Sequence, residues 1–250
     1  MPTMPIGQMC AYCGVMDRPI TRDHVVPKAL WKDQPLPPSL ITVPSCSECQ
    51  AEWDQDATYF RNLIVLCSDP VDHAAIADLA LGAIKRSVHR PAGRRDYADI
   101  TRNAVPGYQQ FGTSILEPAV RIDVESRRFD RTPEKIVRGL FFFRNGFPVP
   151  TNYEVRIFPG SGFWQEEGFA EILATMEPWK CMGDNIFAMR ATRDTVDNNI
   201  TFWLMRFYNS SGILGYTWPR EGTSNGRTVE LSAASLEDHR PANPPARECD

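Results

Sequence analysis

Two short cysteine pairs near the start of the chain are the residues best suited to chemistry. Cys10 and Cys13 form one pair and Cys46 and Cys49 form the other, each with two residues between the cysteines. A tight turn over such a spacing points both sulfurs inward, so two pairs supply the four ligands of a closed, tetrahedral zinc site. The pattern therefore predicts one structural Zn²⁺ that holds the N-terminal part of the chain together.

A second reactive element lies between the cysteine pairs, the run Thr-Arg-Asp-His-Val-Val-Pro-Lys at residues 21–28. The run alternates enough to predict a short strand, which Pro27 ends. Asp23 and His24 are adjacent, so their side chains leave opposite faces of a flat strand. A carboxylate can bind a cation, and an imidazole can act as a general base. The plainer interpretation of the pair is a capped turn with a surface histidine.

Three segments in this order resemble the HNH endonucleases, also called His-Me finger or ββα-metal nucleases. They are the cysteine pair of Cys-Ala-Tyr-Cys-Gly (10–14), called a knuckle, then the Asp-His-x-x-Pro segment, and then a second knuckle, Cys-Ser-Glu-Cys-Gln (46–50). The layout is most similar to the zinc-knuckle type known from phage recombination endonuclease VII. The Asp-His-Val-Val-Pro run is also similar to the HNH segment of CRISPR effector nucleases. The resemblance covers roughly residues 8–66, about a quarter of the chain.

The resemblance implies a role for each matching residue. It implies that the four cysteines hold structural zinc, that Asp23 binds a catalytic Mg²⁺ or Mn²⁺, and that His24 takes a proton from the water that attacks phosphorus. The residue after the second knuckle completes the cation site in the family, where it is Asn or His, and here it is Gln50. Because Gln is one methylene longer and magnesium demands near-ideal octahedral geometry, we expect manganese to support activity better than magnesium. Asp54, one helical turn further on, is an alternative ligand.

Helical periodicity predicts the elements that follow the hairpin. One helix is expected from about Ser47 to Leu66, with Gln50 in its first turn. Its apolar stripe is formed by Trp53, Ala57, Phe60 and Ile64. A second helix is expected to begin at Ser68-Asp69-Pro70 and to run to about His89. Residues 91–118 have no clear period and are expected to be irregular.

From residue 119 onward the pattern predicts a second unit. Thr132-Pro133-Glu134 is interpreted as the start of a helix that ends near Asn145-Gly146. Strands are expected at 120–124, 153–158, 186–190, 200–208 and 213–218, and a helix at 163–176. The strand segment Phe202–Met205 is apolar on both faces and needs cover on both sides. The sequence thus predicts an α+β protein, in which an N-terminal zinc-stapled ββα-metal (HNH) module precedes an α+β domain with a mostly antiparallel sheet.

The predicted division of the chain has four parts: the module at 1–66, a helix and irregular linker at 67–118, the α+β domain at 119–218, and a polar, partly disordered tail at 219–250. Hydrophobic residues make up 42% of the chain, which is enough for a packed core. No apolar run approaches about 18 residues, and Met1–Gln8 lack a signal-peptide pattern, so we expect no membrane association and a cytoplasmic location. Cysteine usage fits zinc in a reducing compartment, with Cys67, Cys181 and Cys249 as plain thiols.

A net charge of −4 argues mildly against a dedicated DNA-binding protein. The predicted nucleic-acid contacts are Arg22 and Lys28, which flank the Asp-His pair, and one basic run in a stretch with no acidic residue between 79 and 95. The basic run consists of Lys85, Arg86, Arg90, Arg94 and Arg95. A solvated helix face is an equally good interpretation of this run.

Three interpretations of function follow. The first is a metal-dependent endonuclease that hydrolyses phosphodiester bonds in nucleic acid, DNA rather than RNA. The second is a zinc-stapled nucleic-acid- or protein-binding module with a decayed nuclease site, which Gln50 and the acidic balance favour. The third keeps the nuclease as the effector subunit of a bacterial defence complex, in which residues 119–218 dock a partner protein or a second copy of the chain.

Overall fold

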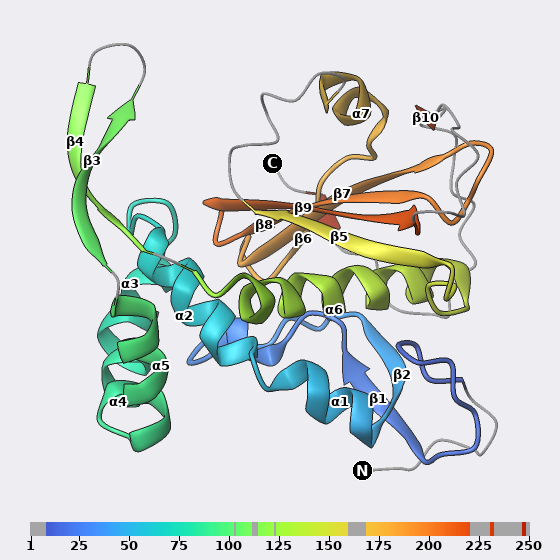
Figure 1. Ribbon diagram of the computed structural model, residues 1–250, viewed down its shortest axis with the longest axis horizontal. Coiled ribbons are helices and arrows are strands. Elements are labelled where there is room, and N and C mark those ends of the chain that lie inside the picture. Colours follow the sequence, from blue (N-terminus) through green and yellow to red (C-terminus); the bar gives the residue numbers. More distant parts are fainter. Residues whose placement is uncertain are drawn as a thin grey trace.

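Helix α6 (Ser126–Asn145) lies between two layers of the protein, the main sheet on one side and the N-terminal elements on the other (Figure 1). This arrangement is seen in a computed structural model. It describes residues 9–102, 104–111, 115–122, 124–159, 169–220, 231–232 and 247–248. Helix α6 is the element that connects the predicted hairpin to the rest of the chain.

The N-terminal layer begins with a β-hairpin followed directly by a helix. Strand β1 (Ile20–His24) pairs antiparallel with β2 (Thr42–Cys46), and α1 (Ser47–Asp54) continues from β2 without a loop. The expected single helix over 47–66 is two helices, since α2 (Ala57–Cys67) starts anew after Asp56. The break has a tertiary cause, because the Asp56 carboxylate accepts a hydrogen bond of 3.0 Å from Arg128 of α6.

The chain then forms a group of short helices and a projecting hairpin. The helices are α3 (Ala74–Asp78), a π-helical segment (Leu79–Ile84), α4 (Lys85–Val88) and α5 (Pro91–Thr101). The helix starts later than predicted because the imidazole of His73 caps it, accepting from the backbone N–H of Ala75 at 3.0 Å.

Residues 91–118 are not the expected irregular linker. Pro91 opens α5, a position where its missing N–H costs no hydrogen bond. Strands β3 (Val105–Phe111) and β4 (Ile115–Arg121) then form an antiparallel hairpin that projects from the body (Figure 1). The strand expected at 120–124 therefore ends at Arg121 and belongs to this arm.

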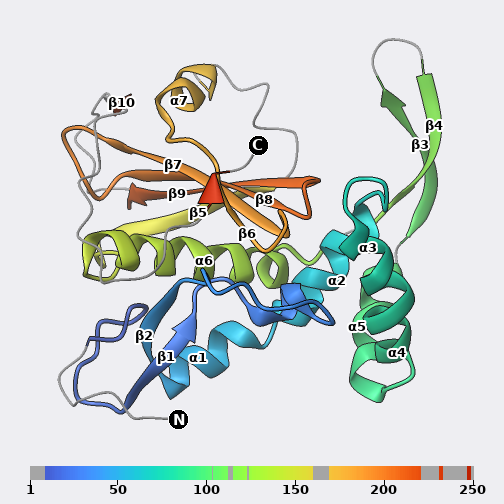
Figure 2. The ribbon, with the colours of Figure 1, turned by 180° about the vertical axis from the view of Figure 1, so that it is seen from behind.

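The C-terminal layer is an antiparallel sheet with the strand order β11-β6-β7-β8-β9-β5, to which β10 adds beside β7. Its strands are β5 (Tyr153–Pro159), β6 (Lys180–Met182), β7 (Phe187–Asp194), β8 (Thr201–Phe207), β9 (Ser211–Pro219), β10 (Leu231–Ser232) and β11 (Arg247–Glu248). The expected α+β class with antiparallel sheets is confirmed. Helix α7 (Phe169–Thr175) lies on the side of the sheet opposite α6 (Figure 2). The earlier part of that predicted helix, 163–168, falls outside the described residues.

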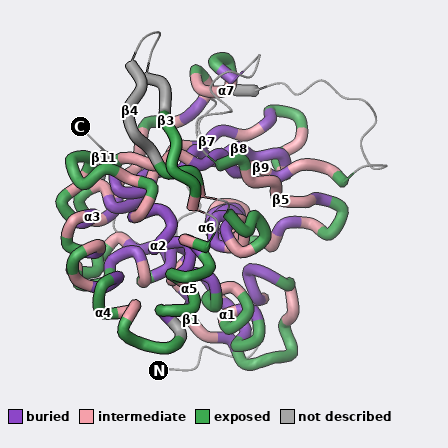
Figure 3. Tube along the Cα trace, turned by 60° about the vertical axis from the view of Figure 1, so that its left-hand side comes forward, coloured by how far each residue is buried: buried purple, intermediate pink, exposed green. Residues whose placement is uncertain are grey.

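Strand β8 is covered on both faces, as its sequence predicts. Trp203 and Met205 belong to the core shared with α6 and the N-terminal layer, whereas Phe202 and Leu204 belong to a second core that includes Phe169 of α7. The first core runs from the knuckle to the sheet without interruption, and the burial colouring follows it through the middle of the molecule (Figure 3). The four-part division of the chain stays a prediction.

Helix α6 begins at Ser126, not at the predicted Thr132-Pro133, and Pro133 lies inside it. Tertiary contacts explain the earlier start, because Phe129 packs against Phe60 with ring centroids 5.1 Å apart. The helix does end at Gly146, whose φ of 76° is the left-handed cap that glycine favours. Among the described helices, none is long and apolar enough to cross a membrane.

Candidate metal centre and hairpin site

The sulfurs of Cys10, Cys13, Cys46 and Cys49 all lie within 4.8 Å of one another. The Cys13 and Cys46 sulfurs are 3.9 Å apart. Four thiolates at the usual Zn–S distance of about 2.3 Å form a tetrahedron with edges of about 3.8 Å, so the spacing fits a zinc ion. Three of the cysteines are buried and Cys13 is exposed. The cluster can hold a zinc ion closed off by four sulfurs.

Local backbone geometry brings the two pairs together. In the first knuckle the N–H of Gly14 donates to the carbonyl of Cys10 at 2.9 Å, and Gly14 takes a left-handed φ of 76°. In the second, Cys46 ends β2 and Cys49 lies in the first turn of α1. The backbone N–H of Cys46 also points at the Cys10 sulfur, 3.4 Å away. The end of the hairpin therefore positions Cys46 and Cys49 beside Cys10 and Cys13.

The thiol pKa values show why a cation suits this cluster. Burial alone raises the pKa of Cys10, but backbone N–H groups directed at its sulfur offset burial and bring the pKa down to about 7. The pKa of Cys49 is instead raised, first by burial and then by its contacts with the neighbouring sulfurs. Several thiolates so close together repel one another unless a positive ion lies between them.

The remaining cysteines behave differently from one another. Cys67 is a free and exposed thiol, as expected. Cys181 is disulfide-bonded, so its interpretation as a plain thiol is wrong. Sequence spacing gave no signal for this, because β6 acquires its neighbours only in the folded sheet. Cys249 lies outside the described residues.

Asp23 and His24 are neighbours in strand β1, and their side chains lie on opposite faces of the strand. Asp23 is only 3% exposed, and its Oδ2 accepts hydrogen bonds from the Tyr12 hydroxyl and the Lys135 ammonium, both at 2.9 Å. Strand alternation places His24 on the opposite face together with Arg22, and there His24 is half-buried and Arg22 exposed. The two residues of the predicted Asp-His site therefore have different surroundings, because Asp23 is buried and His24 is half-buried.

Lys135 of α6 is a site residue that sequence reasoning missed. It is fully buried, and its ammonium also contacts Oδ1 of Asp54 at 2.6 Å. The sequence held one signal for this role, because Lys135 lies at helical spacing from Thr132 and Gly139, so that the three residues share one face of the helix. A lysine on a buried helix face almost always has a charged partner.

The expected cation site at Asp23 and Gln50 does not fit a divalent ion in this arrangement. The Gln50 amide oxygen accepts from the Thr21 hydroxyl at 3.3 Å. Asp23 and Asp54 instead share the Lys135 ammonium. A divalent cation bound to Asp23 would lie about 4 Å from that ammonium. The Coulomb repulsion between the two cations would be about 8 kcal/mol at an effective dielectric constant of about 20. The geometry therefore gives no support to catalytic Mg²⁺ or Mn²⁺ here.

His24 has the character of a base. Burial, and secondly the charge of Lys28, lower the pKa of its imidazole below the ordinary value. Its Nδ1 is a buried atom and has no hydrogen-bond partner among the described residues. A neutral imidazole with a free nitrogen can accept a proton near neutral pH.

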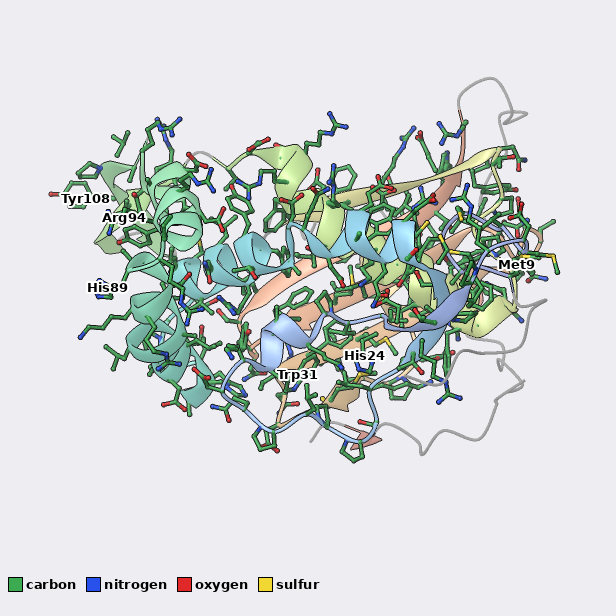
Figure 4. The ribbon with its side chains drawn as sticks, turned by 90° about the horizontal axis from the view of Figure 1, so that it is seen from below. Met9, His24, Trp31, His89, Arg94 and Tyr108 are labelled. Carbon is green, nitrogen blue, oxygen red and sulfur yellow. The ribbon has the colours of Figure 1, made fainter. Side chains whose placement is uncertain are left out.

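The basic run is exposed but lies far from the cysteine cluster. All of its five side chains, on α4, on α5 and at Arg90 between them, are exposed. Seen from below, His89 and Arg94 lie at one end of the molecule, Met9 of the first knuckle at the other, and His24 between them (Figure 4). Arg86 is ion-paired with Asp33.

Comparison with known proteins finds no matching family model, no matching curated protein and no matching solved structure.

Proposed function

We propose that this protein is a zinc-stabilised HNH-type endonuclease that hydrolyses phosphodiester bonds in nucleic acid, with DNA as the preferred substrate. The observation that carries the proposal is the half-buried His24, with a lowered pKa and an unpartnered Nδ1, on a hairpin strand whose partner ends at the four-cysteine cluster. In this proposal zinc fixes the hairpin and His24 performs the proton transfer.

His24 removes a proton from a water molecule, whose oxygen then bonds to phosphorus. The bond from phosphorus to the leaving oxygen breaks, and that oxygen takes up a proton from solvent. General-base catalysis of this kind contributes about 10²–10⁴ in rate. Arg22 lies on the His24 face of β1, and Lys28 is near enough for its charge to lower the His24 pKa. In this proposal these two cations bind the phosphate.

A second candidate is a nucleic-acid- or protein-binding module that no longer cuts. The ion pair between Asp23 and the buried Lys135 favours it, since the predicted cation ligand is already neutralised. The exposed cations of the basic run suit binding without hydrolysis equally well.

The deciding experiment incubates the purified full chain with plasmid, single-stranded DNA and RNA, in EDTA, Mg²⁺ and Mn²⁺, beside His24→Ala. Cleavage by wild type that His24→Ala loses supports the endonuclease. Substrate that is bound but uncut under every condition supports the binding module. Size-exclusion chromatography checks the separate prediction that residues 119–218 dock a partner protein or a second copy.

A further inference from the structure

We infer that the ammonium of Lys135 is a built-in replacement for a divalent cation, so that the wild-type chain binds no divalent metal at Asp23. The inference takes from the proposed HNH-type hairpin only the position where such an ion is expected. The ammonium of Lys135 bridges two carboxylates, contacting Oδ2 of Asp23 at 2.9 Å and Oδ1 of Asp54 at 2.6 Å.

The surroundings of Lys135 show that its ammonium is held in place. Its side chain is 1% exposed and that of Asp23 is 4% exposed, so neither group can turn to solvent without a change in packing. Helix α6 cannot slide away either, because it lies so close to the hairpin that a Cβ at Gly139 would come within 2.8 Å of Val25. The ammonium is therefore buried together with Asp23, whereas its second partner, the Asp54 carboxylate, is 46% exposed.

The charges of the site agree with this role. A buried carboxylate requires a positive partner, and among the described residues the Asp23 carboxylate would keep only the hydrogen bond from the Tyr12 hydroxyl without Lys135. With Lys135 present, a second and doubly charged ion at the same carboxylate meets direct repulsion.

Gln50 provides a separate observation at the same place. Its amide oxygen, which the family resemblance assigns to the cation, is turned to the Thr21 hydroxyl. The Thr21 hydroxyl and the Lys135 ammonium thus each contact an oxygen that would otherwise be a ligand of a metal ion.

The test measures Mn²⁺ binding to the zinc-loaded full chain by electron paramagnetic resonance of free Mn²⁺. Zinc held by four thiolates excludes Mn²⁺, which prefers oxygen ligands. We compare wild type, Asp23→Asn, Lys135→Met, and Lys135→Met combined with Asp23→Asn. Lys135→Met keeps the volume of the side chain but leaves Asp23 and Asp54 without their cation.

Wild type is expected to show no Mn²⁺ site that depends on Asp23. Lys135→Met is expected to gain one Mn²⁺ per chain, bound at least about tenfold more tightly than any wild-type site, and the double variant is expected to lose it. A tenfold gain corresponds to about 1.4 kcal/mol.

Two results overturn the inference. One is a stoichiometric Mn²⁺ site in wild type that Asp23→Asn removes. The other is Lys135→Met with native circular dichroism and no gain in Mn²⁺ binding. Should Lys135→Met fail to fold, the comparison of wild type with Asp23→Asn still decides. Cleavage is not measured, so a metal-binding wild type would overturn this inference and leave the proposed endonuclease standing.

Discussion

The hydroxyl of Tyr12 donates a hydrogen bond of 2.9 Å to Oδ2 of Asp23. Tyr12 lies between Cys10 and Cys13, so the knuckle that can hold zinc also holds the carboxylate of the hairpin. Burial, and secondly the charge of Asp23, raise the pKa of Tyr12, which keeps its hydroxyl protonated and able to donate. The metal centre and the hairpin are thereby one structural unit.

Purified protein should contain about one zinc per chain, and Cys49→Ser should lose it together with thermal stability. Ligand sulfurs must be thiolates, so affinity falls as the pH falls and protons compete for them. The pKa of metal-free Cys10, about 7 against 9.0 for an ordinary thiol, keeps that ligand charged at lower pH. Metal analysis and zinc release against pH measure this. Cys67→Ser is the control, because Cys67 lies outside the cluster; an equal zinc loss in both variants would refute the assignment.

His24→Ala should reduce cleavage by at least about a hundredfold while the zinc content and circular dichroism stay unchanged. A general base must be neutral, and burial lowers the pKa of His24. The midpoint of the acid limb of the wild-type pH–rate profile should therefore lie below 6.5, the ordinary pKa of histidine. His89→Ala is a matched control, since His89 is exposed at the far end of the molecule (Figure 4). A His24→Ala variant that cuts at the wild-type rate would rule out the proposed base.

Replacing Lys85, Arg90, Arg94 and Arg95 by glutamine should weaken binding to all DNA sequences alike. Each lost phosphate contact should reduce the slope of log affinity against log salt by about 0.9. Arg86 is omitted because Asp33 already neutralises it. Fluorescence anisotropy at several salt concentrations provides the slope, and Arg220→Gln serves as an exposed control. An unchanged slope would show that the run only keeps that surface solvated.

Gln50→Asn by itself should gain no cleavage in Mg²⁺ or Mn²⁺, because Lys135 still neutralises Asp23. Combined with Lys135→Met, the same substitution should make cleavage depend on added metal, since the shorter amide and the released carboxylates then suit an octahedral ion. Plasmid nicking with and without each metal measures both. Metal-stimulated cleavage in the single variant would mean that Gln50 alone had detuned the site.

Gly139→Ala should destabilise the fold although alanine is the better helix former. The new Cβ would lie 2.8 Å from both γ-methyls of Val25, and overpacking of this kind costs about 1–3 kcal/mol, against a gain of about 1 kcal/mol in helix propensity. Urea denaturation measures the difference. Gly107→Ala is the control, because no atom lies within 4 Å of its added Cβ. Equal stability of the two variants would contradict the close packing of α6 on the hairpin.

Features that depend on short spacing follow from the amino-acid sequence alone. Two residues between cysteines predict a knuckle, and the four sulfurs do come together. Strands were expected at 200–208 and 213–218, and β8 and β9 form there as an antiparallel pair. A strand apolar on both faces had to be covered twice, and β8 is. Local hydrogen bonding and hydrophobic periodicity fix such features wherever the chain folds.

Only the tertiary structure decided what surrounds the Asp-His pair. Lys135 and Asp23 are far apart in sequence, and no spacing rule links a lysine of one helix to a carboxylate of a distant strand. Their contact arises because α6 packs on the hairpin at Gly139 and on the sheet at Gly215, which buries Lys135 beside the Asp23 carboxylate. The same packing broke the helix at Asp56 and began α6 at Ser126, since the Arg128–Asp56 ion pair and the contact of Phe129 with Phe60 outweighed local propensity.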